Sequence, residues 1–181
     1  PDLGTFIECP NPALQQYVNL SYYGTNRVLR YVFPTYYGFV GSVDAVSPEQ
    51  ALATAQEALL TGEPVTIHYA GLTAATPEQQ RAVRDILLLK QTTDPLLRQA
   101  RFRDAQGLTV PNGVRATVLL GQHCAYIPFL SDGASEGAAV TLRQEPGLAA
   151  LRGIGRAWVV GEADPVRTAV SAGPARTLTV T

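Results

Sequence analysis

The chain carries few charged residues, and their signs nearly cancel. Charged side chains make up 16% of its 181 residues, whereas about 25% is usual in soluble domains. The formal net charge of −1 at pH 7 argues against non-specific nucleic-acid binding, which normally requires a basic excess. Low charge leaves two interpretations open: part of the surface is buried against another molecule, or the surface is polar but rich in Thr, Gln and Ser.

Residues that bind metals are also scarce. The chain has two histidines, His68 and His123, and two cysteines, Cys9 and Cys124. They lack the spacing of a zinc site, so all of them would have to converge from distant segments. We expect no metal and no cofactor. A disulfide between Cys9 and Cys124 would stabilise the fold by about 4–5 kcal/mol, and two thiols that never meet are the alternative.

Two other features are missing from the sequence. It has no apolar run of about 18 residues or more, so we expect no membrane-spanning helix. A phosphate-binding loop would need a glycine-rich turn between a strand and a helix. The turn at 153–155 instead precedes a predicted strand, and Glu162 beside Gly161 would repel phosphate. Nucleotide binding is therefore not predicted.

What the sequence does contain is a repeated signal for the start of a helix. A small polar residue precedes proline at Asn11-Pro12, Ser47-Pro48, Thr76-Pro77, Asp94-Pro95 and Asp164-Pro165. The polar side chain can accept a hydrogen bond from a first-turn N–H, and proline fits the first helical position. After Ser47 and Thr76, a glutamine also stands where a capping box needs it.

These signals and the apolar spacing predict the helices. Helices are expected over 13–19, from Pro48 to about Leu60 with Gly62 as the stop, over 77–91, from Pro95 to near Phe102, and over 165–172. The helix from Pro48 should bury Ala51, Leu52, Ala55 and Leu59, and the helix from Pro77 should bury Val83, Ile86, Leu87 and Lys90.

Apolar alternation and turn residues predict the strands. Strands are expected over 27–33, 64–70, 114–120, 122–129, 138–143, 157–160 and 177–180, with a bulge at Gly121 and an exposed turn over 131–137. We therefore predict an α+β fold, with mixed α/β as the alternative. It would be a single compact domain over 1–181 with an extended N-terminal arm over 1–10, a largely antiparallel sheet and about four to five short-to-medium helices that start at proline.

Aromatic residues gather in one segment. Six of the eight tyrosines lie between Tyr17 and Tyr37. Tyrosine suits a surface that becomes half-buried on association, because its ring is apolar and its hydroxyl still finds a partner. An aromatic side of the protein's own core is the alternative. The predicted interface comprises Tyr17, Tyr22, Tyr23, Tyr31, Phe33, Tyr36, Tyr37 and Phe39.

The fallback candidates for catalysis are Cys124 as nucleophile and His68 or His123 as base. His123 and Cys124 are adjacent, so on a regular strand their side chains point to opposite faces and cannot form a dyad with each other. His68 could approach Cys124 from a neighbouring strand. The simpler interpretation is a half-buried histidine and a buried thiol that reacts slowly.

The function that this sequence favours is non-enzymatic. Low charge, the aromatic segment and the extended arm indicate a structural or assembly subunit of a larger particle or surface layer, viral or of the cell envelope. Its partners would be copies of itself or neighbouring structural subunits. An extracellular, envelope or virion location is favoured over a cytoplasmic one. The alternatives are a small Cys/His-dependent hydrolase or transferase and an envelope ligand-binding module.

Overall fold

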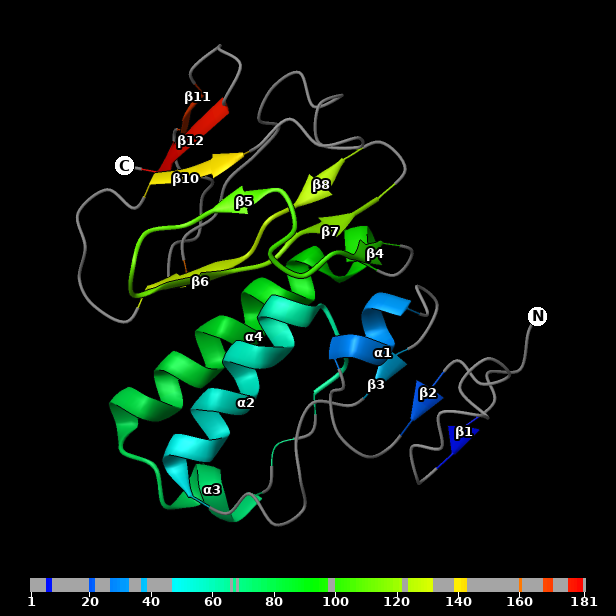
Figure 1. Ribbon diagram of the computed structural model, residues 1–181. Coiled ribbons are helices and arrows are strands. Elements are labelled where there is room, and N and C mark those ends of the chain that lie inside the picture. The colour runs from blue at the N-terminus through cyan, green and yellow to red at the C-terminus, as the bar shows by residue number, and fades with distance from the viewer. Residues whose placement is uncertain are drawn as a thin grey trace.

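A computed structural model of the chain combines helices with several small sheets. It describes residues 6–7, 20–21, 27–32, 37–38, 47–65, 67, 69–97, 100–121, 124–131, 139–142, 160, 168–170 and 176–180. Helices α2 (Pro48–Thr61) and α4 (Pro77–Leu97) lie side by side, and small sheets lie across one end of this pair (Figure 1). The predicted α+β class is therefore confirmed.

Helix α2 begins and ends where the sequence predicts. The Gln50 N–H donates to Ser47 Oγ at 3.2 Å, and the Ser47 N–H donates to Gln50 Oε1 at 3.0 Å, which completes the predicted capping box. Gly62 follows the helix with φ 69° and donates its N–H to the carbonyl of Ala58. This left-handed conformation favours glycine and satisfies a carbonyl of the last turn.

Helix α4 begins at the second predicted capping box. The Gln79 N–H donates to Thr76 Oγ1 at 3.2 Å, and the Thr76 N–H donates to Gln79 Oε1 at 2.9 Å. Each box satisfies two backbone donors that the helical hydrogen-bond pattern leaves open. The start signals at Ser47 and Thr76 are therefore structural caps.

The end of α4 differs from the prediction. The helix does not stop at Gln91 and restart at Pro95, but continues without a break to Leu97. Lys90 Nζ donates to Asp94 Oδ1 at 2.7 Å, so Asp94 pairs along the helix instead of capping a new one. Pro95 lies in the last turn, where its missing N–H affects only the carbonyl of Gln91.

The main core forms where α2 packs against α4. Ala55 and Leu59 of α2 meet Val83 and Ile86 of α4 in one buried apolar cluster. Alanine lets the two helices approach closely, and burial of each larger side chain contributes about 1.5–3 kcal/mol. The two predicted apolar faces are confirmed by the buried side chains of Ala51, Ala55, Leu59, Val83, Ile86 and Lys90 and by the half-buried side chains of Leu52 and Leu87.

Helices α2 and α4 run in the same direction, so both begin at the end of the pair near α3 (Tyr69–Thr73) (Figure 1). The positive ends of two helix dipoles therefore lie close together, and Glu49 and Glu78 in the first turns offset them. The pKa of Glu49 lies below its usual range, chiefly because its own backbone N–H donates to the carboxylate, with further hydrogen bonds from the side chains of Ser47 and Gln79. This carboxylate stabilises the fold above its unfolded-state pKa and loses that effect as the pH falls.

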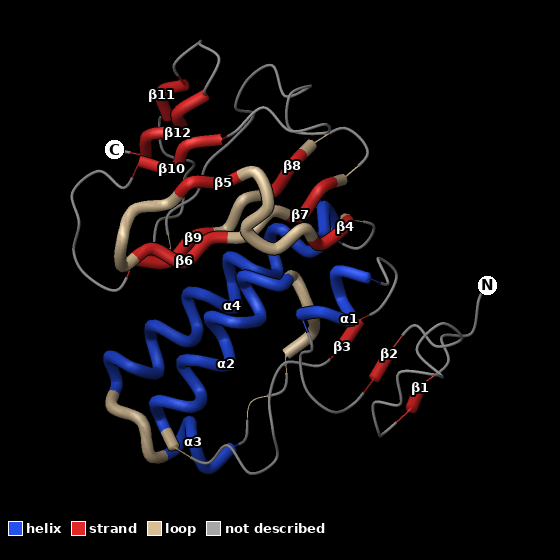
Figure 2. The backbone as a smooth tube through the Cα atoms, in the orientation of Figure 1, coloured by secondary structure: helices blue, strands red, loops and turns tan. Residues whose placement is uncertain are grey.

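Within the described ranges, the strands are short and form four separate sheets, drawn as red segments in Figure 2. One is parallel, with the order β1 (Phe6–Ile7), β2 (Leu20–Ser21) and β3 (Tyr37–Gly38). The other three sheets are antiparallel. The four-stranded sheet has the order β11 (Thr168–Val170), β12 (Arg176–Val180), β10 (Ala139–Leu142) and β5 (Leu108–Thr109). A three-stranded sheet has the order β4 (Arg101–Phe102), β7 (Leu119–Leu120) and β8 (Ala125–Tyr126), and the last sheet pairs β6 (Val114–Ala116) with β9 (Phe129–Ser131). Antiparallel pairing therefore dominates as predicted, but not within one sheet.

Two polar contacts join the sheets to α2. The Thr117 hydroxyl, between β6 and β7, donates to the carbonyl of Leu60 near the end of α2. Arg115 on β6 donates from Nη2 to Gln56 Oε1 at 3.0 Å. A second buried cluster forms above them from Ala100, Phe102 and Leu119, with Tyr126 packed at its edge. Helix α2 therefore contacts both helix α4 and the part of the fold that contains β6 and β7.

Two predicted strands near the helices are wrong. Residues 27–33 were expected as a strand, but Arg27–Val32 form helix α1. Strand propensity spans only about 1 kcal/mol, so tertiary contacts can override it, and the ion pairs of Arg27 attach this helix to the rest of the fold. Over the predicted strand 64–70, Val65 makes a single bridge and helix α3 begins at Tyr69. Burial of Gly71 and packing of Leu72 on the main core favour that helix.

Other differences lie at the edges of the predicted elements. The predicted strand 114–120 is divided into β6 and β7, and Arg101–Phe102 form β4 instead of ending a helix. In place of a bulge, Gly121 lies in the connection between β7 and β8, where its N–H donates to the carbonyl of Cys124 at 2.8 Å. Part of the predicted helix 165–172 is strand β11, which pairs with β12. The strand predicted over 177–180 is confirmed in β12, and β10 confirms that over 138–143.

The remaining predictions fall only partly on the described residues. Four helices are described, and of these α2 and α4 begin at proline. The predicted helix 13–19 and most of the predicted arm 1–10 lie outside the described residues. Val160, at the end of the predicted strand 157–160, lies in a turn. The single-domain organisation over 1–181 stays a prediction.

We expect Ser47→Ala and Thr76→Ala each to lower the free energy of unfolding by about 0.5–2 kcal/mol, because first-turn N–H groups lose an acceptor. Urea denaturation monitored by circular dichroism measures this loss. Gln91→Ala is the control, because the Gln91 side chain is exposed on α4 and has no hydrogen-bond partner among the described residues. Its effect should stay within about 0.5 kcal/mol. Unchanged stability in both capping variants would contradict the structural role of the boxes.

Candidate functional site

A hollow of about 480 Å³ lies between α3 and α4. Its apolar floor is made by Leu72 of α3 and by Val83 and Leu87 of α4. Val83 and Leu87 are four residues apart, and this spacing places them on one face of the helix. The floor is continuous with the main core, because Leu72 and Leu87 pack against the α2–α4 cluster. A rigid part of the fold therefore supports the hollow.

Large apolar side chains stand at the edge of the hollow. Tyr69 is 76% exposed and Leu88 is 52% exposed, and both line the space. We call the hollow together with these two side chains the α3–α4 groove. Scattered exposed apolar residues are common, but an apolar depression flanked by exposed aromatic and aliphatic side chains is typical of a binding surface.

The polar side chains of the groove come mainly from α4. Gln80 Nε2 donates to the carbonyls of Leu72 at 2.9 Å and Ala75 at 3.1 Å, so Gln80 ties the end of α3 to the start of α4. Arg84 is the charged residue of the lining. Its Nε and Nη2 atoms donate to Asp85 Oδ1 at 3.1 and 2.9 Å. The groove therefore combines an apolar floor with an amide and a guanidinium at its edge.

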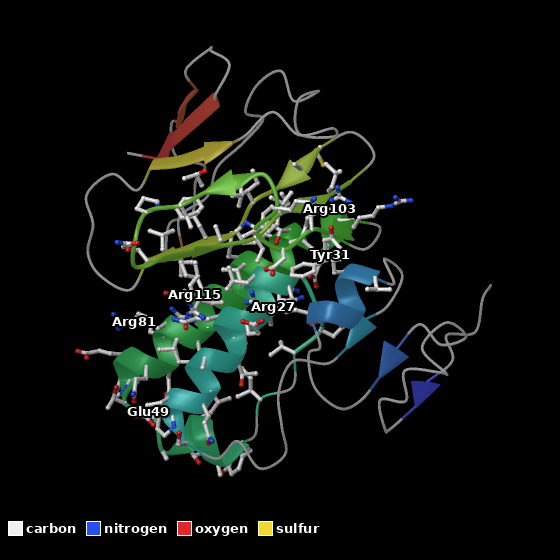
Figure 3. All side chains as sticks on the ribbon, in the orientation of Figure 1. Arg27, Tyr31, Glu49, Arg81, Arg103 and Arg115 are labelled. Carbon is white, nitrogen blue, oxygen red and sulfur yellow. The ribbon has the colours of Figure 1, made fainter. Side chains whose placement is uncertain are left out.

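A second exposed surface lies on α1. Tyr31 is 42% exposed and Val32 is 57% exposed. The Tyr31 hydroxyl donates to Gln106 Oε1 at 3.1 Å, and Arg103 Cζ lies 6.0 Å from the centre of the Tyr31 ring. Figure 3 shows Tyr31 of α1 close to Arg103, which follows β4. Tyr31 is thus held against the β4–β5 connection while part of its ring faces solvent.

Arg27 attaches α1 to two other parts of the fold. Its Nε and Nη2 donate to the two carboxylate oxygens of Glu57 on α2 at 2.7 and 2.9 Å, and its Nη1 donates to Asp104 Oδ1 at 3.1 Å. Asp104 has a φ of 48°, a left-handed conformation that aspartate tolerates better than most residues. The hydrogen bond to Glu57 is the main cause that raises the pKa of Arg27. The guanidinium therefore stays charged at every pH at which the protein folds.

Only part of the predicted interface lies among the described residues. Tyr31 is exposed on α1, and Tyr37 belongs to strand β3. The other members lie outside the described residues: Tyr17, Tyr22, Tyr23, Phe33, Tyr36 and Phe39. Their role in an interface stays a prediction.

The predicted environment of Cys124 is wrong. The Cys124 side chain is exposed just before β8, and it is not a buried residue within a strand. The slow reaction expected from burial therefore no longer follows. Cys9, His68 and His123 lie outside the described residues, so a catalytic pairing and a disulfide both stay predictions. Within the described part of the chain, no three His, Cys, Asp or Glu residues lie close enough to hold a metal ion.

Sequence reasoning did not identify the α3–α4 groove. One available signal was the run of four apolar residues at 86–89. Four consecutive residues cover slightly more than one helical turn, so a helix that packs on one face must leave one of them towards solvent. Leu88 is that residue. The helical state of α3, the other wall, depends on tertiary packing and had no comparable signal.

Comparison of the chain with protein-family models, with curated proteins and with solved structures finds no match in any of the three. No helix within the described ranges has the length and apolar character needed to cross a membrane.

We expect Arg27→Gln to speed amide hydrogen exchange in α1 while α2 and α4 keep their exchange rates, because Arg27 fixes α1 through two carboxylates. Local opening of α1 should become easier by on the order of 1 kcal/mol, since the ion pairs are partly exposed. About 1 M salt should produce the same faster exchange in the wild type. Because folding raises the pKa of Arg27, deprotonation of the guanidinium removes its contribution only as the pH rises past the ordinary arginine pKa.

Arg101→Gln is the control for this prediction, because Arg101 is exposed and has no ion pair among the residues that the structure describes. Unchanged exchange in α1 of Arg27→Gln, or equally faster exchange throughout α2 and α4, would contradict the proposed local role.

Proposed function

We propose that this chain is a non-enzymatic structural subunit that assembles with neighbouring proteins through the α3–α4 groove. The observation that carries this proposal is the exposure of Tyr69 and Leu88, at 76% and 52%, beside an apolar hollow. Full burial of a side chain such as Leu88 contributes about 1.5–3 kcal/mol. Tyrosine is also enriched among residues that carry most of the binding energy.

The rigidity of the groove supports the same proposal. Its floor belongs to the α2–α4 core, and Gln80 fixes the connection between α3 and α4 through two hydrogen bonds. A preformed surface loses little conformational freedom on binding, so more of the contact energy appears as affinity. The groove is therefore suited to a stable contact.

The tyrosine-rich segment remains part of the proposal as a second contact surface. Tyr31 and Val32 on α1 are its exposed members among the described side chains. We propose that the assembly is a larger particle or surface layer, in an extracellular, envelope or virion location. Low overall charge, at 16% of residues, suits a chain whose surface is partly covered by neighbours.

The size of the hollow favours a second candidate, an envelope ligand-binding module. About 480 Å³ falls within the range of small-molecule sites, about 300–1,000 Å³. A small ligand in the hollow would, however, leave the outward parts of Tyr69 and Leu88 in water. A protein partner covers both, so we favour assembly.

We expect Leu88→Asp to reduce incorporation of the chain into its native assembly by at least about tenfold, because a carboxylate would be buried against an apolar partner. Incorporation is measured by sedimentation of tagged protein co-expressed with the wild type in its source. Ala53→Asp is the matched control, since Ala53 is an exposed helical residue of α2 outside the groove lining. Thermal denaturation should show that both variants fold.

Equal incorporation of Leu88→Asp and Ala53→Asp would contradict a role for the groove. A wild-type chain that stays monomeric at high concentration and sediments alone from its source would contradict the assembly function itself.

A further inference from the structure

We infer that the partner in the α3–α4 groove is an amphipathic helix of a different chain, with a carboxylate beside its apolar face. This inference rests on the proposed function, because it specifies the partner of the same surface.

The backbone around the groove favours a helix as the occupant. Both walls of the hollow are helical, so neither presents the open edge of a sheet. Most backbone N–H and C=O groups of the long helix α4 are paired within it, and the Leu72 carbonyl of α3 accepts from Gln80. An extended peptide gains affinity by pairing its main chain with an open sheet edge, and these walls offer no such edge. A helix brings its own backbone groups already paired. It needs only apolar side chains for the floor.

The length of the groove sets the length of that helix. The lining residues of α4 extend from Gln80 to Gln91, which corresponds to about 16 Å at a rise of about 1.5 Å per residue. A partner helix of about three to four turns covers this distance. Recognition of this kind uses apolar anchors at positions i, i+3 or i+4, and i+7. Leu72, Val83 and Leu87 form the floor that such anchors would contact.

The charges on the exposed face of α4 indicate the sign of the charge that the partner carries. The side chain of Arg84 is 65% exposed, whereas that of its partner Asp85 is only 19% exposed. The cation therefore faces outward and the carboxylate inward. Arg84 Nη1 has no acceptor among the described residues. Arg81, one turn earlier and also exposed, has no ion pair within the described part of the chain. A carboxylate on the partner helix can accept from these guanidinium groups.

The same charges disfavour a second copy of this chain as the occupant. A copy that used this face would place a second Arg84, the charged residue of the lining, and a second Arg81 in the same contact. Like charges across a contact oppose association. A chain with an acidic flank gains from both arginines, and we therefore assign the groove to a different chain.

Two synthetic helical peptides of about fifteen residues test this inference. Both have the same leucine face, and one has glutamates where the other has lysines along one flank. Binding to the full-length protein is measured by fluorescence anisotropy at low salt. We expect the glutamate peptide to bind about threefold to tenfold more tightly than the lysine peptide, with the difference shrinking at high salt. Arg84→Glu should remove or reverse the preference, Leu88→Asp should weaken both peptides, and Ala53→Asp should change neither.

The other possible results overturn either the inference or the proposed function, and they can be told apart. Equal binding of the two peptides overturns the acidic partner. No binding of either peptide, while Leu88→Asp still impairs incorporation, overturns the helix and leaves the assembly function standing. A purified wild type that dimerises, with Leu88→Asp monomeric, assigns the groove to a second copy. Normal peptide selectivity with unimpaired incorporation of Leu88→Asp contradicts the proposed function instead.

Discussion

The close packing of α2 against α4 is the contact on which the rest of the described structure depends. Alanines on α2 allow the approach, and Leu59, Val83 and Ile86 fill the core. Helix α2 then holds the other parts: Glu57 binds Arg27 of α1, and the carbonyl of Leu60 accepts from Thr117 between the strands. A change that separated α2 from α4 would therefore affect the helices and the sheets together.

The groove follows from the same packing. Helix α4 carries four apolar residues in succession at 86–89, more than one buried face of a helix can hold. Contact with α2 covers Ile86, while α3 covers only part of the opposite side, and Leu88 is left at the surface. The floor of the groove is shared with the core, because Leu72 and Leu87 pack against the α2–α4 cluster. A rigid apolar surface beside outward-facing arginines is the physical basis of the proposed assembly role.

Local signals in the sequence predicted the parts of the fold that local interactions determine. The capping boxes at Ser47 and Thr76, the stop at Gly62 and the apolar faces of both long helices required only neighbouring residues. The predicted elements were wrong where contacts between residues far apart in the sequence influence the local structure. Arg27 forms its ion pairs with residues 30 and 77 positions away, and these attach 27–32, which is helical despite its strand propensity, to the rest of the fold. Asp94 resembled a cap but pairs with Lys90, and the walls of the groove meet only after α3 has packed.

Hydroxyl-radical footprinting of the chain, alone and within the assembly isolated from its source, tests the central claim most directly. The reagent modifies exposed tyrosine and leucine side chains, so it reports on Tyr69 and Leu88 without a mutation. We predict that both lose most of their reactivity on assembly, while the exposed side chains of Arg101 and Pro111, outside the groove lining, keep theirs. Unchanged modification of Tyr69 and Leu88 in the intact assembly, with protection elsewhere on the chain, would contradict the account.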